Sequence, residues 1–445
     1  MKNTNEIRTG KCIDYTFDGQ GVVKIDNRII FVPGLLKDEE AEIEILYHKK
    51  DFDVGKIKKI NKLSKDRVEP RCKVANSCGG CTFMNLSYDK QIELKTKRVE
   101  DALSKIAKVP AKLEHFYKMD NPFNYRNKIQ VPYRYDKQKR LVYGFFKAKT
   151  HDVVYSENCA IQDERASKIL KTLQNLIISF KIAPYNEDLR KGLIRHVLIR
   201  TGYYSKEIMV VLVTTNEEFK GKNNFIKELI RIHPEITTVI QNYNSLDTNV
   251  ILGQKEQVLY GPGFIYDSLC GVKFKISSKS FYQTNPIQTE VLYSLAINKA
   301  NLNKNDVILD AYCGIGTIGL IASKNCKEVY GVEIVKEAIE DAKINAKLNN
   351  FSNAHYECND AKNYILNKNF DCIFVDPPRK GLDEEFINSL LKSNCKKIVY
   401  ISCDPETLAR DLFKLKVKYN IESVNCVDMF AHTSHCETVC LLTKK

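Results

Sequence analysis

Residues 307–319 read VILDAYCGIGTIG, an apolar run that leads directly into a glycine-rich turn. The run predicts a strand buried on both faces, and the residues after the turn predict a helix. Gly314 and Gly316 would let the backbone approach a ligand closely. Further apolar runs alternate with helical stretches up to the C-terminus, at residues 329–332, 372–375 and 397–402. We therefore expect an α/β domain with a doubly wound parallel sheet in this part of the chain.

Two classes of ligand fit this turn. Its glycines satisfy the G-x-G-x-x-G pattern of dinucleotide sites, which would suit an NAD-linked oxidoreductase. Asp310 lies immediately before the turn, where a carboxylate would repel a pyrophosphate but suits the cationic methionyl part of S-adenosylmethionine. Glu333, at the end of the next strand, could accept hydrogen bonds from two ribose hydroxyls, and Asp360 could accept one from the adenine amino group. These carboxylates favour the methyl donor.

Two later strands end in a reactive side chain that is followed closely by proline. One strand leads into Asp376-Pro377-Pro378-Arg379, and the next leads into Ser402-Cys403-Asp404-Pro405. Ligands of parallel sheets bind beyond the carboxyl ends of the strands, and proline turns the chain out of the strand there. Cys403 is therefore a candidate nucleophile, and Arg379 could stabilise its thiolate.

A second group of cysteines lies in the first part of the chain. Cys72, Cys78 and Cys81 surround Gly79-Gly80, and Cys159 follows after a further 77 residues. Four thiolates can hold a [4Fe-4S] cluster or a zinc ion. The chain has 15 cysteines, an odd number, and no export signal, which favours a reducing, cytoplasmic location over a disulfide framework.

The charge distribution favours a polyanionic partner. The chain carries 69 Lys and Arg against 55 Asp and Glu, a net charge of +14. Residues 121–150 alone hold eight Lys or Arg, seven aromatic residues and one acid. The runs 129–135 and 141–146 predict a hairpin that offers cations to phosphates and rings to bases. The alternative is a solvated edge hairpin whose aromatic side chains belong to the core.

The N-terminal residues predict a separate small module. Alternating stretches at 7–15, 22–32, 41–47 and 54–60 are separated by turn signals, and short strands of this kind close most economically into a barrel. The chain has no apolar run near the roughly 18 residues that a membrane span requires, so no membrane association is expected. No protein partner is predicted.

Five motifs occur in the order seen in the RNA 5-methyluridine methyltransferases, and the chain is similar to that family over nearly its whole length. The motifs are FYQTN at 281–285, DAYCGIG at 310–316, DPPR at 376–379, SCDP at 402–405 and HCE at 435–437. The chain resembles the ribosomal RNA branch, in which a TRAM barrel and an iron-sulfur domain precede the catalytic domain. The relatives that modify tRNA usually lack both.

The resemblance implies a three-domain organisation. Residues 1–60 would form a TRAM/OB-like β-barrel, and residues 61–275 a central mixed α/β iron-sulfur domain that binds RNA. Residues 276–445 would form a Rossmann-like class I methyltransferase domain. A [4Fe-4S] cluster would then be held by Cys72, Cys78, Cys81 and Cys159.

The resemblance also implies the chemistry and the substrate. Cys403 would add to C6 of uracil, and Glu437 would remove the C5 proton as general base. The donor-binding residues would be Gln283, Asp310, Tyr312, Gly314, Gly316, Glu333, Asp360 and Asp376, of which Gln283 and Asp376 could instead hold the uracil edge. The expected substrate is a uridine of 23S ribosomal RNA. The alternatives are a tRNA uridine-C5 methyltransferase, an NAD-linked oxidoreductase and a noncatalytic RNA-binding protein.

Overall fold

The computed structural model describes residues 6–110, 113–147, 150–248 and 250–445. The chain divides into two units. Unit 1 comprises Met1–Arg98, Phe145–Val154 and Phe430–His435, and unit 2 comprises Val99–Gly144, Tyr155–Met429 and Cys436–Lys445. The three-domain division expected from the sequence is a finer one and stays a prediction.

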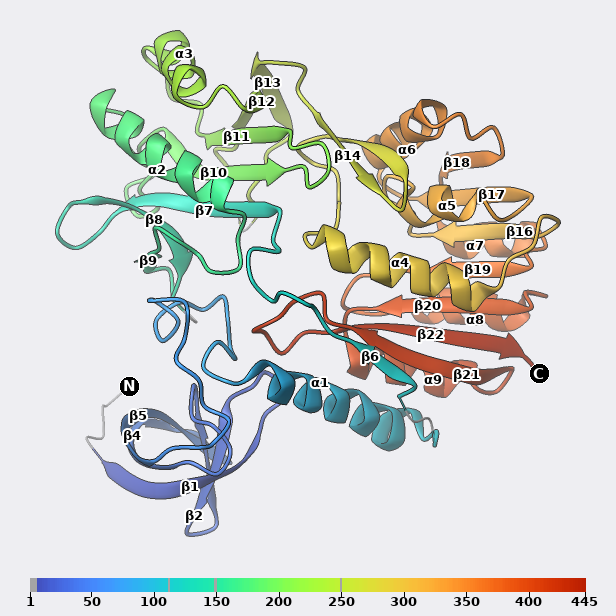
Figure 1. Cartoon of the computed structure of the whole chain (residues 1–445), viewed down its shortest axis with the longest axis horizontal. Helices are drawn as coiled ribbons and strands as arrows, with labels where there is room; N and C mark the ends of the chain where they lie inside the picture. Colours follow the sequence, from blue (N-terminus) through green and yellow to red (C-terminus); the bar gives the residue numbers. More distant parts are fainter. Residues whose placement is uncertain (1–5, 111–112, 148–149, 249) are drawn as a thin grey trace. The chain divides into compact units, whose positions relative to one another are not determined.

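Unit 1 contains a closed five-stranded barrel, drawn in blue in Figure 1. Its strands are β1 (Ile7–Tyr15), β2 (Gly21–Ile25), β3 (Arg28–Val32), β4 (Glu40–His48) and β5 (Phe52–Lys62), in the order β1-β2-β3-β5-β4. Every second side chain of these strands turns inward, so that Cys12, Val23, Ile30 and Ile43 pack in one apolar core. The predicted barrel is confirmed, and its assignment as a TRAM barrel stays a prediction.

The run at 22–32 is two strands and not one. A turn at Asp26-Asn27, both with positive φ, separates β2 from β3. Aspartate and asparagine tolerate this left-handed conformation, which suits two-residue hairpin turns.

The middle of the chain builds a seven-stranded sheet with the order β13-β12-β11-β10-β7-β8-β9. Its strands are β7 (Lys128–Tyr135), β8 (Leu141–Phe146), β9 (Val153–Tyr155), β10 (Ile194–Thr201), β11 (Ile208–Thr214), β12 (Ile236–Tyr243) and β13 (Lys255–Tyr260). Helices α2 (Glu164–Ser179) and α3 (Lys222–Ile232) accompany the sheet, and β14 (Ile265–Leu269) pairs with β15 (Val272–Ile276) in a separate hairpin. The predicted hairpin at 129–135 and 141–146 is the pair β7 and β8.

The C-terminal part of unit 2 is built on an eight-stranded sheet with the order β18-β17-β16-β19-β20-β22-β21-β6. Its strands are β6 (His115–Tyr117), β16 (Val307–Ala311), β17 (Glu328–Glu333), β18 (Ala354–Cys358), β19 (Cys372–Val375), β20 (Lys397–Ser402), β21 (Tyr419–Val427) and β22 (Glu437–Lys444). Strands β16 to β20 are mutually parallel, as predicted. The expectation of a wholly parallel sheet is wrong at its other end, because β22 runs antiparallel to β20 and to β21.

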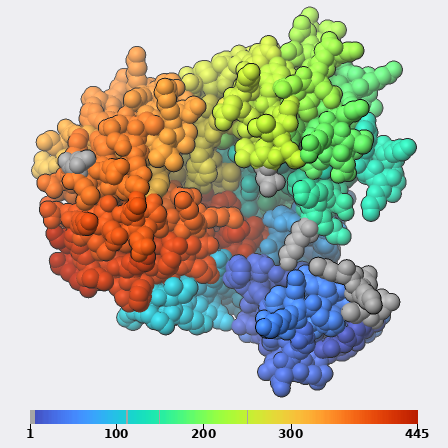
Figure 2. Space-filling model, turned by 180° about the vertical axis from the view of Figure 1, so that it is seen from behind, coloured from blue at the N-terminus to red at the C-terminus, as the bar shows by residue number. Residues whose placement is uncertain are grey.

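Helices lie on both faces of this sheet (Figure 1). They are α4 (Pro286–Ala300), α5 (Thr317–Ala322), α6 (Lys336–Leu348), α7 (Ala361–Asn367), α8 (Glu384–Lys392) and α9 (Pro405–Leu415). Asn285 caps α4 by accepting the N–H of Gln288, and Pro286 is its first residue. Figure 2 shows the residues of this region, orange to red, as one continuous packed body.

One further helix precedes the central sheet. Helix α1 (Tyr88–Ala102) continues into a π-helical turn at Leu103–Ala107. In the described part of the chain, no helix is long and apolar enough to cross a membrane.

Candidate active site

The candidate residues of the later motifs meet at one edge of the eight-stranded sheet. Asp310 lies in β16, Asp376 directly follows β19, and Cys403 directly follows β20. The strands are parallel neighbours, with Asp310 opposite Phe374 and Val375 opposite Tyr400. Their carboxyl ends therefore present these three side chains side by side.

The antiparallel strand β22 brings Glu437 to the same edge. Ser402 pairs with Thr438 in the last described pair of β20 and β22, so Cys403 and Glu437 occupy the next opposed positions. Side chains at opposed positions have Cβ atoms about 4.5–5.5 Å apart. The Thr438 hydroxyl also donates to the Ser402 carbonyl at 3.0 Å, which fixes this register.

Local caps hold Cys403 between a strand and a helix. Asp404 accepts the N–H of Thr407 at 2.9 Å and caps α9, and Pro405 is the first residue of that helix. The thiol is half-buried. Burial, followed by the nearby carboxylates Glu437 and Asp376, raises the pKa of Cys403 to about 12, and Arg379 opposes this rise. The resting side chain is therefore a thiol.

Three carboxyl groups at this edge, Asp310, Asp376 and Glu437, carry raised pKa values, and we call them the carboxylate edge. Burial raises the pKa of Asp376 to about 7 and the pKa of Asp310 to about 7, with Asp376 and Glu333 adding to the latter. Burial and the Asp376 charge raise the pKa of Glu437 well above its ordinary value. Each charge would be more stable beside a cation.

The glycine turn has the features of a cofactor cradle. Asp310 Oδ2 accepts the N–H of Gly319 at 2.7 Å, whereas its buried Oδ1 has no hydrogen-bond partner among the described residues. Gly314 has φ +54°, and a Cβ there would meet open space. Tyr312 adopts φ +64°, which is strained for a bulky residue and typical of functional sites. An unpartnered carboxylate oxygen beside open backbone fits the cationic methionyl group of S-adenosylmethionine.

Gly316 is required for the close packing of the turn against Tyr356. It has φ +83°, and a Cβ there would come within 2.7 Å of the Tyr356 hydroxyl. Tyr312 packs its ring against Phe386 with 5.4 Å between the ring centroids. The turn is therefore fixed from two sides before any ligand binds.

The two predicted nucleoside contacts differ in how they are engaged. Glu333 Oε1 accepts the N–H groups of Ile334 and Val335 at 2.8 and 3.0 Å, which orients the carboxylate at the end of β17. Asp360 caps α7 by accepting the N–H of Lys362 at 3.1 Å and also pairs with the Lys362 ammonium. Glu333 therefore fits a ribose contact, and the adenine contact of Asp360 stays a prediction.

Gln283 is buried in the loop before α4. Asn127 Nδ2 donates to its carbonyl at 3.3 Å. The Tyr293 hydroxyl lies near the side chains of Gln283 and Thr317, and burial is the main cause that raises its pKa. Sequence reasoning missed Tyr293, because in the sequence it is one more apolar residue of a buried helix.

The predicted cluster ligands are not confirmed. Cys78 Sγ accepts the N–H of Gly80 at 3.3 Å, and burial followed by nearby Cys72 raises the pKa of Cys78. All four cysteines are described, and Cys159 belongs to unit 2. In the described ranges, no three or more His, Cys, Asp or Glu side chains form a group that could hold a metal.

Some cations of the predicted hairpin form ion pairs with acidic side chains. Arg134 pairs with Glu187, and Arg140 pairs with Asp136 at 2.8 Å. Lys149 lies outside the described residues.

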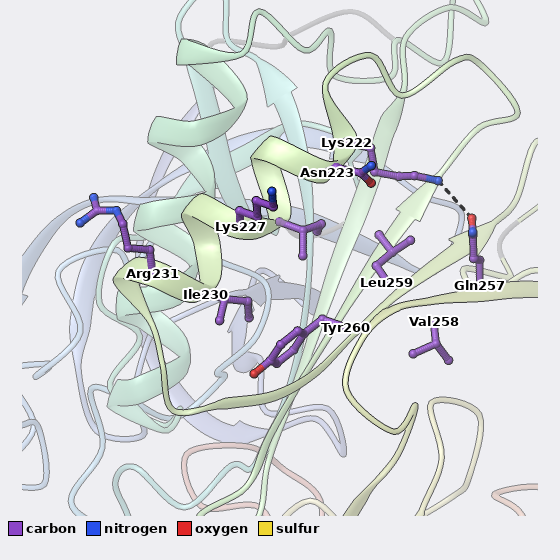
Figure 3. Close-up of a pocket in the computed structure, with 10 residues that line it drawn as sticks. Lys222, Asn223, Lys227, Ile230, Arg231, Gln257, Val258, Leu259 and Tyr260 are labelled. Atoms are coloured by element: carbon purple, nitrogen blue, oxygen red, sulfur yellow. Dashed lines mark hydrogen bonds between the residues drawn. The ribbon is translucent and has the colours of Figure 1, made fainter.

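A groove of about 560 Å³ lies between α3 and β13 (Figure 3). It is lined by Lys222, Asn223, Ile226, Lys227, Ile230, Arg231, Gln257, Val258, Leu259 and Tyr260. None of these is a cysteine, a histidine or an acid. The groove is therefore no alternative site for methyl transfer.

Comparison with known proteins gives consistent results. A family model described as tRNA (Uracil-5-)-methyltransferase matches residues 87–445. An RNA methyltransferase of Staphylococcus aureus MSSA476, described as uncharacterized, is 42% identical over 99% of each chain. A similarly described RNA methyltransferase of Oceanobacillus iheyensis is 41% identical over 100% of this chain and 98% of its own. The crystal structure of Pyrococcus abyssi tRNA (uracil-54, C5)-methyltransferase with S-adenosyl-L-homocysteine is 28% identical, with a TM-score of 0.81 over 98% of this chain and 100% of that one.

Proposed function

The chain belongs to the tRNA (uracil-5-)-methyltransferase family, and from this premise we propose that Cys403 and Glu437 carry out its reaction by covalent catalysis. The protein is an S-adenosylmethionine-dependent RNA uracil-5 methyltransferase with the class I methyltransferase fold and an N-terminal five-stranded barrel. This assignment decides against an NAD-linked oxidoreductase and against a noncatalytic RNA-binding protein.

The proposed reaction begins at Cys403. After its proton has passed to solvent, the thiolate adds to C6 of uracil and the C5–C6 π electrons become an enolate, which makes C5 nucleophilic. S-adenosylmethionine supplies the electrophilic methyl group. The Glu437 carboxylate then takes the C5 proton, the C5–C6 double bond forms again, and the thiolate leaves.

The observation that supports this proposal is the register of β20 and β22. Nucleophile and base must reach adjacent ring carbons, C6 and C5. The last described pair is Ser402 with Thr438, so Cys403, directly after β20, lies next to Glu437, the first residue of β22. Arg379 lies close enough to favour the thiolate electrostatically. Asp376 lies beside both residues, which suits the proposed contact with the uracil edge.

The donor would be held at the glycine turn. Asp310 would face the cationic methionyl group and Glu333 the ribose. Gly314 would allow close approach of the donor, Gly316 would hold the turn against Tyr356, and Tyr312 would line the pocket. Asp360 would contact the adenine, and Gln283 would hold the uracil edge or the donor.

Two RNA substrates are candidates. We propose 23S ribosomal RNA, on the resemblance to the branch in which an iron-sulfur domain as well as a barrel precedes the catalytic domain. Transfer RNA is the second candidate, because the Pyrococcus abyssi enzyme acts on tRNA and yet matches 98% of this chain, including the barrel. The presence of a barrel therefore does not separate the two substrates.

The cluster remains a proposal that rests on cysteine spacing and resemblance. Iron and acid-labile sulfide should accompany the anaerobically purified protein and be lost in Cys78→Ala. Protein that contains neither element would leave Cys72, Cys78, Cys81 and Cys159 as ordinary thiols.

The central experiment supplies labelled S-adenosylmethionine with either purified 23S rRNA or bulk tRNA, both unmodified. The wild type should form 5-methyluridine in one of them, identified by mass spectrometry of the nucleosides. Cys403→Ala should form none. Methylation at another atom, or equal methylation by the variant, would overturn the covalent mechanism.

A further inference from the structure

Three cations gather where β7 begins, outside the carboxylate edge. Lys128 of β7 is directly opposite Arg200 of β10, and Arg126 Nε donates to the Lys128 carbonyl at 3.1 Å. In the described part of the chain, none of the three has an ion-pair partner. We call Arg126, Lys128 and Arg200 the cation seam.

The charge of the seam is uncompensated. Burial, followed by nearby Arg200 and Arg126, lowers the pKa of Lys128 to about 8. Burial lowers the pKa of Arg200 to about 10, although a guanidinium remains charged at neutral pH. Buried charge without a counterion destabilises a fold, so a bound anion would relieve this cost.

Arg200 has spare hydrogen-bonding capacity. The side chain is 4% exposed and donates from Nη2 to the Ser280 carbonyl. Its Nε is buried without a partner among the described residues, and the same holds for the hydroxyl of nearby Tyr282. Both groups can donate, so the missing partner is an acceptor.

The seam is bonded to the loop that carries Gln283. The Asn127 N–H donates to the Thr284 carbonyl at 2.9 Å, and Asn127 Nδ2 donates to the Gln283 carbonyl at 3.3 Å. Arg200 holds Ser280 of the same loop. A ligand on Arg126 and Lys128 would therefore lie within a few residues of a proposed uracil contact.

We propose that the cation seam binds a phosphodiester of the RNA strand that presents the target uridine. This inference rests on the proposed function for its RNA substrate. Arg126 and Lys128 are partly exposed and would contact the phosphate oxygens, while buried Arg200 strengthens the positive potential beneath them. A phosphodiester supplies negative charge and acceptor oxygens to Arg126 and Lys128, and every internal uridine has one on each side.

The test measures binding of a fluorescein-labelled single-stranded oligouridylate by anisotropy at potassium chloride concentrations from about 50 to 300 mM. Lys128→Gln and Arg126→Gln should each weaken binding by about 5- to 10-fold at the lowest salt and reduce the slope of log affinity against log salt by roughly 0.7. Lys128→Arg, which keeps the charge, should restore the slope. The matched control is Arg231→Gln in α3, where Arg231 pairs with Glu228, and its slope should equal that of the wild type.

Separate measurements of melting temperature, cofactor affinity and methylation distinguish a loss of RNA binding from a loss of folding or of activity. Lys128→Gln should melt at or above the wild-type temperature, because it removes an uncompensated charge, and should keep its affinity for S-adenosylhomocysteine. If both seam variants show the same slope as Arg231→Gln while the wild type makes 5-methyluridine, the phosphate site is overturned and the proposed function stands. If the slopes fall but no RNA is methylated by the wild type, the phosphate site stands and the proposed function fails.

Discussion

The carboxylate edge and the cation seam are built on opposite electrostatic principles. The edge holds Asp310, Asp376 and Glu437, whose buried carboxyl groups have raised pKa values. The seam holds cations, and the pKa values of Lys128 and Arg200 are lowered. Each region carries charge that the fold leaves unneutralised, and each sign suits one of two ligands: a sulfonium donor and a polyanionic RNA. An ionised carboxylate edge and a charged cation seam would each lower the stability of the fold until a ligand of opposite charge binds.

Replacing the nucleophile should separate the two regions most strongly. Cys403→Ala should lower methyl transfer by roughly 10⁴-fold or more, the scale of removing a covalent nucleophile. RNA affinity should stay within about twofold, because the seam is intact. The measurements are single-turnover formation of 5-methyluridine and anisotropy with the same RNA. Cys270→Ala, in the turn of the β14–β15 hairpin, is the control and should retain activity. If Cys403→Ala also lost RNA binding, the carboxylate edge and the cation seam would not act independently.

Removing the base should trap the intermediate. Glu437→Gln should lower turnover by about 10²- to 10⁴-fold, as expected for loss of a general base. A protein–RNA adduct that survives a denaturing gel should accumulate, and it should be absent in the double variant with Cys403→Ala. Free enzyme after methyl transfer would assign the base to another residue.

The melting temperature of Glu437→Gln tests whether the Glu437 carboxylate is uncompensated in the folded protein. The folded pKa of Glu437 is raised, so its contribution to stability is complete below the unfolded value of about 4.3 and is lost as the pH rises through the folded pKa. Glutamine cannot ionise and avoids that loss. Glu437→Gln should therefore melt above the wild type at pH 8 and close to it at pH 4. A lower melting temperature at pH 8 would mean that the Glu437 carboxylate is paired.

Ionisation of Asp310 should make binding of the cationic donor depend on pH. Its pKa is raised to about 7, so affinity for S-adenosylmethionine should rise between pH 6 and pH 8 as the carboxyl ionises. S-adenosylhomocysteine has an uncharged sulfur and should show a smaller rise. Asp310→Asn should weaken donor binding by about tenfold, roughly 1.4 kcal/mol, while its amide oxygen still accepts the Gly319 N–H. Asp376 also ionises near pH 7, so part of the pH dependence should remain in titration calorimetry; equal pH profiles for the two nucleosides would place the sulfonium elsewhere.

The carboxylate edge was far more predictable from sequence than the cation seam. Strand runs, a glycine turn and proline after a strand are local signals, and the rule that ligands bind beyond parallel strand ends brings Asp310, Asp376 and Cys403 together. The antiparallel direction of β22 was not predicted, because direction depends on how the chain returns to the sheet. That direction gives Glu437 its position opposite Cys403.

The seam depends on pairings between distant segments. Arg200 lies in a strand whose residues are all buried, and nothing near it in sequence indicates that Lys128 will be its neighbour. The composition of residues 121–150 predicts a hairpin that offers cations to phosphates, yet Glu187 neutralises Arg134 from far along the chain. Composition therefore identified the charge surplus, and only the register of β7 and β10 shows where it is uncompensated.

The smallest expected effect is a gain in stability at the seam. The folded pKa of Lys128 is lowered, so its contribution to stability is full above the unfolded value of about 10.4 and is lost as the pH falls through about 8. Lys128→Met has no such loss and should exceed the wild type in free energy of unfolding at pH 7, with the difference vanishing near pH 10.5. Urea unfolding at both pH values measures this. Lys227→Met, on the wall of the α3–β13 groove, should change stability by less than about 0.5 kcal/mol. If Lys128→Met were less stable than the wild type at pH 7, the Lys128 ammonium would have a counterion in solution, and the seam would have no charge left for an RNA phosphate to neutralise.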